Sequence, residues 1–212
     1  NAMIGMLSLL DNVSPTDEQN QYIKSLKKIA ESNLSNINNV ISFQELEAGK
    51  IKLQKDNFNI KDTINSVYQT LLPIALEKSI ELNVQISDNI PPFLVGDSRR
   101  LKHIIYDLTY NGIKASLTGK VSIDVFLNHI NNKNMAHLDF AISDSSYGIS
   151  DEASPYIFEL IQPKGKKTHY NSLELAIAKK LLELQESAIT VESIIGKGTT
   201  FYFSLVIPVG KE

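Results

Sequence analysis

The chain has 212 residues, of which 42% are hydrophobic and 21% are charged, and this is enough for one α/β domain with a helical appendage. The net charge is −3 with both signs mixed, which argues against a nucleic-acid partner, since such proteins usually carry a strongly basic face. The absence of cysteine excludes disulfides, thiolate metal sites and thiol nucleophiles. No apolar run approaches the roughly 20 residues of a membrane-spanning helix, so we expect no membrane contact by this chain.

Residues 1–50 have the pattern of paired helices. Residues 3–13 are apolar on nearly every side, which predicts part of a buried helix. Ser14 is the expected cap of a second helix, with Pro15 in its first turn and Asp17 three residues after the cap. Apolar residues then follow a spacing of three and four until Gly49: Ile23, Leu26, Ala30, Ile37 and Ile41. The pattern predicts an antiparallel two-helix hairpin that dimerises into a four-helix bundle.

After residue 50 the pattern changes to mixed strands and helices. Alternation predicts strands, and a helical period predicts helices between them. The expected strands are 52–60, 80–86, 121–127, 137–143, 189–193 and 200–206, and the expected helices are 61–78, 97–115 and 172–185. A polar turn is expected at 131–134. The fold class predicted for residues 51–212 is therefore an α+β sandwich, with helices on one face of a mixed sheet.

Five stretches are similar, in order, to signatures of the sensor histidine kinases of two-component systems. They are SFQELEAGK at 42–50, GDSRRL at 96–101, DLTYNGIK at 107–114, DSSYGI at 144–149 and GKGTTF at 196–201. Each stretch alone is weak evidence for the resemblance, but five stretches in the family's order are strong evidence for it. The resemblance implies the C-terminal part of a dimerisation hairpin over 1–50 and an ATP-binding domain over 51–212. It also implies ATP and Mg²⁺ as cofactors, a homodimer, a response-regulator receiver domain as partner, and a cytoplasmic location, either free or as part of a membrane-bound sensor.

The matching residues suit a nucleotide chemically. Adenine offers its exocyclic amine to one acceptor, and Asp144 at a strand end is such an acceptor, although a turn aspartate would look the same. Asn111 has an oxygen donor of the kind Mg²⁺ prefers, and Lys114 shares its helix face and could reach a phosphate, or could be a solvated surface lysine. Gly148 would let the backbone turn beside the base, and Thr199 could donate a hydroxyl near it.

Asp107 occupies the first asparagine position of the Asn111 motif and has three readings. It could help to hold the metal, or it could reflect sequence drift. It could also activate water, as an acid four residues before the metal-binding asparagine does in hydrolysing relatives of the same superfamily, but such base chemistry first needs a bound triphosphate.

Several departures from the family pattern cluster around the nucleotide. The glycines of the second glycine box are replaced by Tyr170, Ser172 and Glu174, although Leu173 and residues 175–177 keep the packing side. Those glycines let backbone N–H groups close on phosphates at a helix N-terminus, and a glutamate there would repel them. Further departures are Ser146 for a glycine, Ala115 for an aromatic residue, and a basic stand-in for the lid at 162–171, with Lys164, Lys166 and Lys167. If restoring glycine at positions 170, 172 and 174 did not raise the affinity for nucleotide, the result would point instead to a collapsed pocket that Ser146 or Tyr147 fills.

No histidine of this chain stands where the family carries its phosphoacceptor, in the first dimerisation helix. The four histidines are His103, His129, His137 and His169. We therefore expect no catalytic residue in this chain. Three functions stay open: a signalling core with degraded ATP binding that acts by docking, dimerisation, relay or phosphatase roles; an active kinase with a divergent lid and an upstream phosphoacceptor; and an ATP hydrolase that uses Asp107.

Overall fold

The structure is a computed structural model that describes residues 16–160, 169–170 and 172–211. The chain divides into two compact units between Ala48 and Gly49. The predicted helix at 3–13 and its turn lie outside the described residues, so the two-helix hairpin is not shown. Within the part of the chain that the structure describes, no helix is both long and apolar enough to cross a bilayer.

The first unit contains the long helix α2, Asp17–Glu47. The predicted cap at Ser14 is wrong, because Thr16 is the N-cap. Its hydroxyl accepts a hydrogen bond from the Gln19 N–H at 3.3 Å, and the Gln19 side chain accepts one from the Thr16 N–H at 2.9 Å. The predicted stop is confirmed, since α2 ends just before Gly49, whose φ of +62° is left-handed.

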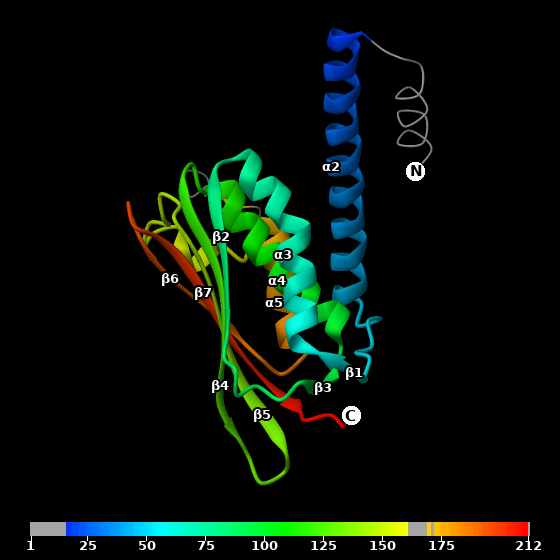
Figure 1. The fold of residues 1–212 in the computed structure, drawn as a ribbon, viewed down its shortest axis with the longest axis vertical. Coiled ribbons are helices and arrows are strands. Elements are labelled where there is room, and N and C mark those ends of the chain that lie inside the picture. The colour runs from blue at the N-terminus through cyan, green and yellow to red at the C-terminus, as the bar shows by residue number, and fades with distance from the viewer. Residues whose placement is uncertain (1–15, 161–168, 171, 212) are drawn as a thin grey trace. The chain divides into compact units, whose positions relative to one another are not determined.

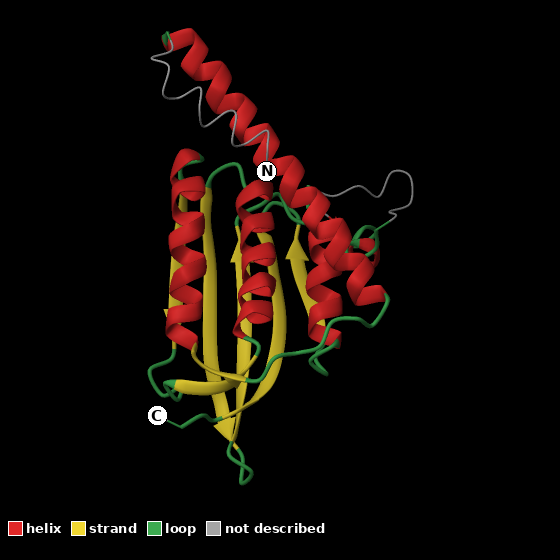
Figure 2. Ribbon diagram, turned by 90° about the vertical axis from the view of Figure 1, so that its right-hand side faces the viewer, coloured by secondary structure: helices red, strands yellow, loops and turns green. Residues whose placement is uncertain are grey.

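The second unit is a mixed five-stranded sheet with helices on one face, which confirms the predicted α+β class. The strand order is β2-β4-β5-β7-β6, parallel between β2 and β4 and antiparallel elsewhere. The strands are β2 Ile80–Ile86, β4 Gly119–Ile130, β5 Met135–Asp144, β6 Ile189–Ile194 and β7 Gly198–Pro208. Helices α3 Ile60–Glu77, α4 Ser98–Ala115 and α5 Ser172–Glu183 lie side by side over the sheet, and a short helix spans Ser154–Tyr156 (Figures 1 and 2).

Most expected elements appear, but the strand predicted over 52–60 is wrong. Only β1, Asp56–Asn59, is extended, and it pairs with β3, Phe93–Gly96, which the pattern did not predict. The Asn59 side chain ends the strand, because its oxygen accepts hydrogen bonds from the N–H groups of Lys61 and Asp62. Asn59 is therefore the N-cap of α3, and Ile60 belongs to the helix.

The core lies between the sheet and the three helices. Along β5 the even-numbered residues face the helices, and Ala136, Leu138, Phe140 and Ile142 are almost fully buried. Phe140 stacks on Phe203 of β7 at a centroid distance of 4.5 Å. Asp144, the last residue of β5, is also even-numbered. Because side chains alternate between the two faces of a strand, its carboxylate lies on the face that the helices cover.

Helix α4 is held at both ends by polar side chains. At its start, Asp97 accepts hydrogen bonds from the N–H groups of Arg100 and Gln54, each at 3.0 Å. At its end, the Lys78 ammonium donates to the carbonyl oxygens of Ile113, Lys114 and Ser116 at 2.7–3.0 Å. These contacts fix the helix that carries Asp107 and Asn111.

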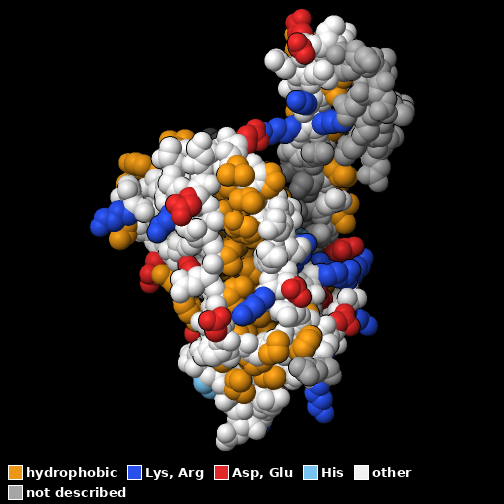
Figure 3. Space-filling view, viewed as in Figure 1, with side chains coloured by type: hydrophobic (Ala, Val, Ile, Leu, Met, Phe, Trp, Pro, Cys, Tyr) orange, Lys and Arg blue, Asp and Glu red, His pale blue; other side chains and the backbone are white. Residues whose placement is uncertain are grey.

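A groove of about 590 Å³ runs between α3 and the edge strand β2. Its apolar lining consists of Tyr68, Leu82, Val84 and Ile86, with polar residues from the first turns of α3 beside them. In the space-filling view, hydrophobic side chains gather over the region of β2 and α3 (Figure 3). This groove lies on the edge of the sheet and does not include Asp144 or Asn111.

Candidate functional site

The backbone around Asp144 is packed closely by two glycines. A Cβ atom added to Gly112 of α4 would lie 3.0 Å from the Cβ of Asp144. Gly198 opens β7 with φ of +115°, and a Cβ there would collide with the Asp144 carbonyl oxygen. Because both positions lack a Cβ, α4 and β7 can both approach the end of β5 closely. Asp144 consequently lies in a buried junction of three elements, 8% exposed.

The Asp144 carboxylate is bound by side chains of this chain. The hydroxyl of Tyr170 donates to Oδ2 at 2.7 Å, and the Ser146 N–H donates to Oδ1 at 2.9 Å. The Ser146 hydroxyl lies 2.8 Å from the Tyr170 hydroxyl. Since the Tyr170 proton goes to Asp144, Ser146 acts as the donor to Tyr170. These contacts form one buried network at the position expected for adenine.

The ring of Tyr170 is itself packed in the core. It is 6% exposed and meets the ring of Phe201 edge-on, with centroids 5.6 Å apart and an interplanar angle of 81°. Burial raises the pKa of Tyr170 well above its usual range, and the charge of Asp144 adds to this. Burial also raises the pKa of Asp144, although its hydrogen bonds with Ser146 and Tyr170 oppose the rise. The phenol is therefore a firmly protonated donor.

Asn111 and Glu174 form a second buried contact beside the first. The Asn111 amide donates to Glu174 Oε2 at 2.8 Å and to the Asp107 carbonyl oxygen at 3.0 Å. Asn111 is fully buried and Glu174 is 4% exposed. Asn111 directly precedes Gly112, which packs on Asp144, and Glu174 lies four residues after Tyr170 in the chain. The two contacts therefore belong to one site.

Asp107 faces His103 one turn earlier on α4. His103 Nε2 lies 3.2 Å from Asp107 Oδ2. This distance permits an ion pair, but among the described residues Oδ2 meets no donor with good hydrogen-bond geometry. Burial raises the pKa of Asp107 despite the nearby histidine. For His103, burial acts to lower the pKa, but the nearby carboxylate of Asp107 outweighs it, and the pKa is raised.

The remaining predicted residues lie around this site with separate partners. Lys114 is exposed, and its ammonium lies over the ring of Tyr110, 5.1 Å from the centroid. Gly148 has φ of +89°, and a Cβ there would meet the carbonyl oxygen of Ile194. Thr199 is buried, pairs with Asp144 across the strands, and its hydroxyl lies 2.8 Å from that of Ser193. The structure thus brings Asp144, Thr199 and Asn111 together, whereas the Asp107 carboxylate faces His103 and the Lys114 ammonium lies over Tyr110.

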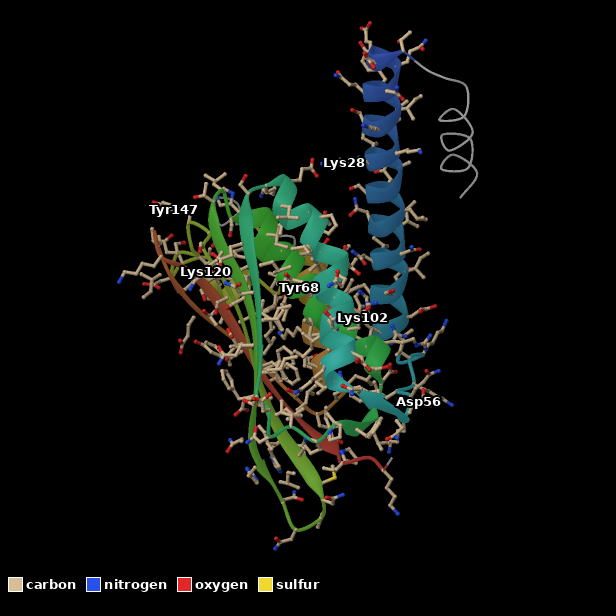
Figure 4. All side chains as sticks on the ribbon, in the orientation of Figure 1. Lys28, Asp56, Tyr68, Lys102, Lys120 and Tyr147 are labelled. Carbon is tan, nitrogen blue, oxygen red and sulfur yellow. The ribbon has the colours of Figure 1, made fainter. Side chains whose placement is uncertain are left out.

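The pattern missed the residue that contacts Asp144 directly. Of the two residues named as candidates to fill a collapsed pocket, Ser146 is buried, whereas Tyr147 is 65% exposed and lies at the outer end of the strands (Figure 4). Tyr170 takes that place instead. A buried carboxylate needs a donor, and an aromatic hydroxyl that replaces a glycine was the available signal. Lys164, Lys166 and Lys167 lie outside the described residues.

A nucleotide does not fit these side chains as they lie. The amine of an adenine would have to compete with the hydroxyl of Tyr170 for Asp144, and the phosphates of a nucleotide would face the Glu174 carboxylate beside Asn111. Within residues 16–160, 169–170 and 172–211, no three acidic or histidine side chains converge to hold a metal ion. No step through ATP follows from this arrangement.

Comparison with known proteins identifies the family. Residues 96–209 match the family of histidine kinase-, DNA gyrase B- and HSP90-like ATPases. Sensor histidine kinase GacS of Pseudomonas protegens is 31% identical over 98% of this chain and 23% of its own length. Autoinducer 2 sensor kinase/phosphatase LuxQ of Vibrio vulnificus is 28% identical over all of this chain and 25% of its own length. The first eight curated relatives are matched over 9% to 30% of their own lengths.

Solved structures agree with this assignment. Full-length ShkA in complex with AMPPNP superposes with a TM-score of 0.78 at 27% identity, over 99% of this chain and 43% of that one. AdeS of Acinetobacter baumannii shares the fold, with a TM-score of 0.69 at 18% identity, over 99% of this chain and 96% of that one. The chain belongs to the family of histidine kinase-, DNA gyrase B- and HSP90-like ATPases, and within it to the sensor histidine kinases.

Proposed function

We propose that this chain is the core of a two-component signalling protein whose ATPase-type domain no longer uses ATP. It acts through dimerisation and docking, or in relay or phosphatase roles. One observation carries the proposal: the two polar groups expected for a nucleotide are both bound from within, Asp144 by Tyr170 and Asn111 by Glu174.

The phosphate end gives the stronger physical argument. A triphosphate needs backbone N–H groups at a helix N-terminus and no opposing charge. Glu174 lies in the first turn of α5, where it brings a carboxylate into a buried place beside Asn111. Because charges interact more strongly away from water, a buried carboxylate opposes phosphate more than an exposed one does. Loss of backbone contacts is also harder to compensate than loss of one side chain.

The partners belong to the same proposal. Leu26, Ile37 and Ile41 of α2 are about half exposed, which supports a homodimer through the helical segment 1–50, with 51–212 as the ATPase-type domain. The relatives include a hybrid signal transduction histidine kinase of Dictyostelium discoideum and the sensor kinase/phosphatase LuxQ. By this likeness we propose a receiver domain as the docking partner, in the cytoplasm.

The alternative functions each require a change at the site. An active kinase would bind ATP and Mg²⁺ with Asp144, Asn111, Lys114 and Gly148; the solved relative ShkA is in complex with AMPPNP. In this chain, Tyr170 would first have to move away from Asp144, and Glu174 from Asn111. A hydrolase would use Asp107, which lies against His103.

Titration with ATP and Mg²⁺, followed by calorimetry and thermal unfolding, separates these functions. We expect no heat of binding and no shift of the melting temperature up to about 1 mM nucleotide, because a ligand stabilises only the state that it binds. A micromolar Kd that Asp144→Asn abolishes would establish the active kinase instead. Phosphate release that Asp107→Asn abolishes would establish the hydrolase.

A further inference from the structure

We infer that the ring of Tyr170 is an internal ligand, which fills a slot that would otherwise take a small planar molecule with a hydrogen-bond donor on its edge. Such molecules include p-cresol, which is the tyrosine side chain itself, and adenine. The inference rests on the proposed function, because it names the class of ligand for the same site.

The walls of the slot have the shape of a ring. The edge of Tyr170 meets the fully buried ring of Phe201, and its hydroxyl reaches the junction where Gly112 and Gly198 leave no Cβ beside Asp144. Tyr170 is 6% exposed. An aromatic ring of this size that is removed from a packed interior leaves a space of its own shape, unless the walls collapse.

The closed end of the slot is polar and accepts one hydrogen bond from the ring that fills it. Asp144 Oδ2 takes the hydrogen bond of Tyr170, and the Ser146 hydroxyl lies against the same phenol oxygen. The other carboxylate oxygen is bound by the Ser146 N–H. Without the phenol, a buried oxygen loses a donor, and an unmade hydrogen bond in such a place is costly. A guest with a donor restores that bond, whereas a hydrocarbon of equal shape does not.

The neighbouring contact limits the guest to molecules without phosphate. Glu174 lies four residues after Tyr170 in the chain and binds Asn111, the residue before Gly112. This carboxylate stays in place when only the ring of Tyr170 is removed. The slot therefore accepts a neutral ring, and it disfavours a nucleotide whose phosphates would extend toward Glu174.

The test uses the whole chain with Tyr170→Ala, which opens the slot, and Tyr170→Phe, which removes only the hydroxyl and leaves the ring. Tyr22→Ala, at an exposed tyrosine of α2, is the matched control. We expect Tyr170→Ala to bind p-cresol with a Kd of about 1 mM or lower, and toluene at least about tenfold more weakly. At ten times the Kd, p-cresol should raise the melting temperature of Tyr170→Ala by about 4 °C.

Wild type, Tyr170→Phe and Tyr22→Ala should show no such stabilisation by p-cresol. Adenine should stabilise Tyr170→Ala, and ATP with Mg²⁺ at the same concentration should not. Equal binding of toluene and p-cresol would overturn the role of Asp144 as the selecting acceptor. A folded Tyr170→Ala that binds neither would overturn the inference, because no slot of this shape would then exist. If the variant does not fold alone, saturating p-cresol should restore its circular dichroism spectrum, and failure to do so would overturn the inference.

The same titrations distinguish this inference from the proposed function. Tight binding of ATP by wild type would overturn the proposed function. If wild type does not bind ATP and Tyr170→Ala does not bind p-cresol, only the internal-ligand inference fails.

Discussion

The amide of Asn111 donates a hydrogen bond to the carboxylate of Glu174 at 2.8 Å, although the two residues are 63 positions apart and both are buried. Asn111 lies on the buried face of α4, four residues before the helix ends at Ala115, and Glu174 comes from the first turn of α5. The contact therefore joins two neighbouring helices at the end where the site lies. Glu174 is a structural partner of Asn111 as well as a charge that opposes phosphate.

Glu174→Leu should lower the free energy of unfolding by about 1–3 kcal/mol, because the buried amide of Asn111 loses an acceptor. Glu174→Gln should cost much less, since its side-chain oxygen can still accept that hydrogen bond. Urea denaturation measures both. Glu183→Leu, an exposed position of the same helix, is the control and should change stability by about 0.5 kcal/mol or less. Equal losses for the leucine and glutamine variants would contradict the role of Glu174 as an acceptor.

The scaffold of the site was predictable because it depends on local periods. The strand 80–86 and the helices around 61–78 and 98–115 follow from alternation and helical spacing, and the parity of β5 directs Asp144 toward the helices. The predictions that differ from the structure concern the ends of helices and strands. Strand 52–60 is reduced to Asp56–Asn59, because pairing with β3 starts only at Asp56 and Asn59 caps α3. The cap of α2 is Thr16 instead of Ser14, because Gln19 completes a capping box with Thr16.

The contacts that fill the site were not predictable from periods. Tyr170 meets Asp144 from 26 positions away, and no pattern along the chain says which side chain enters a pocket that lost its glycines. The sequence indicated only that side chains crowd this place. Which one fits depends on the space between β5, β7 and α4, where Gly112 and Gly198 permit a close approach. Such a match is a property of packing in three dimensions.

Asp97 should stabilise the domain through both carboxylate oxygens. Asp97→Ala removes the cap of α4 and the acceptor for the Gln54 N–H, and we expect a loss of about 1–3 kcal/mol in the free energy of unfolding. Asp97→Asn can keep the cap with its one oxygen, but its amide nitrogen cannot accept from Gln54, so we expect about half that loss. Chemical denaturation of both variants measures the difference.

Asp88→Ala is the control for this series, because Asp88 is fully exposed and its only described ion pair is the surface contact with Lys61 at 3.5 Å. It should leave stability nearly unchanged. If Asp97→Asn is as unstable as Asp97→Ala, the helix cap contributes little to the free energy of unfolding. The hydrogen bond from the Gln54 N–H would then account for the stabilisation by Asp97.

The pair of His103 and Asp107 should make stability fall as pH rises. The pKa of His103 is raised above 6.5 because Asp107 outweighs the effect of burial, so the protonated ring stabilises the fold below pH 6.5. That contribution is lost as pH rises through the folded pKa. Burial raises the pKa of Asp107 above 3.8, so the folded state also holds this proton more tightly, and ionisation at higher pH costs stability.

We therefore expect wild type to have a lower free energy of unfolding at about pH 8.5 than at about pH 6, and His103→Gln to reduce that difference. Urea denaturation at both pH values measures it. His169→Gln, at an exposed histidine, should keep the wild-type dependence. A His103→Gln variant with the full wild-type fall would show that other groups cause it.

Restoration of the three glycines tests whether side chains in the second glycine box exclude ATP. The triple variant Tyr170→Gly, Ser172→Gly and Glu174→Gly frees the Asp144 acceptor, removes the carboxylate at Asn111 and exposes backbone N–H groups at the start of α5. We expect it to bind ATP with Mg²⁺ at least about tenfold more tightly than wild type in calorimetry. Asp144→Asn in the triple background should abolish the gain, because it replaces an acceptor with a group that also donates. A triple variant that stays folded but gains no affinity for ATP would show that the bulk and charge of these side chains are not what prevents ATP binding. The pocket would then be closed by the packing of β5, β7 and α4 itself.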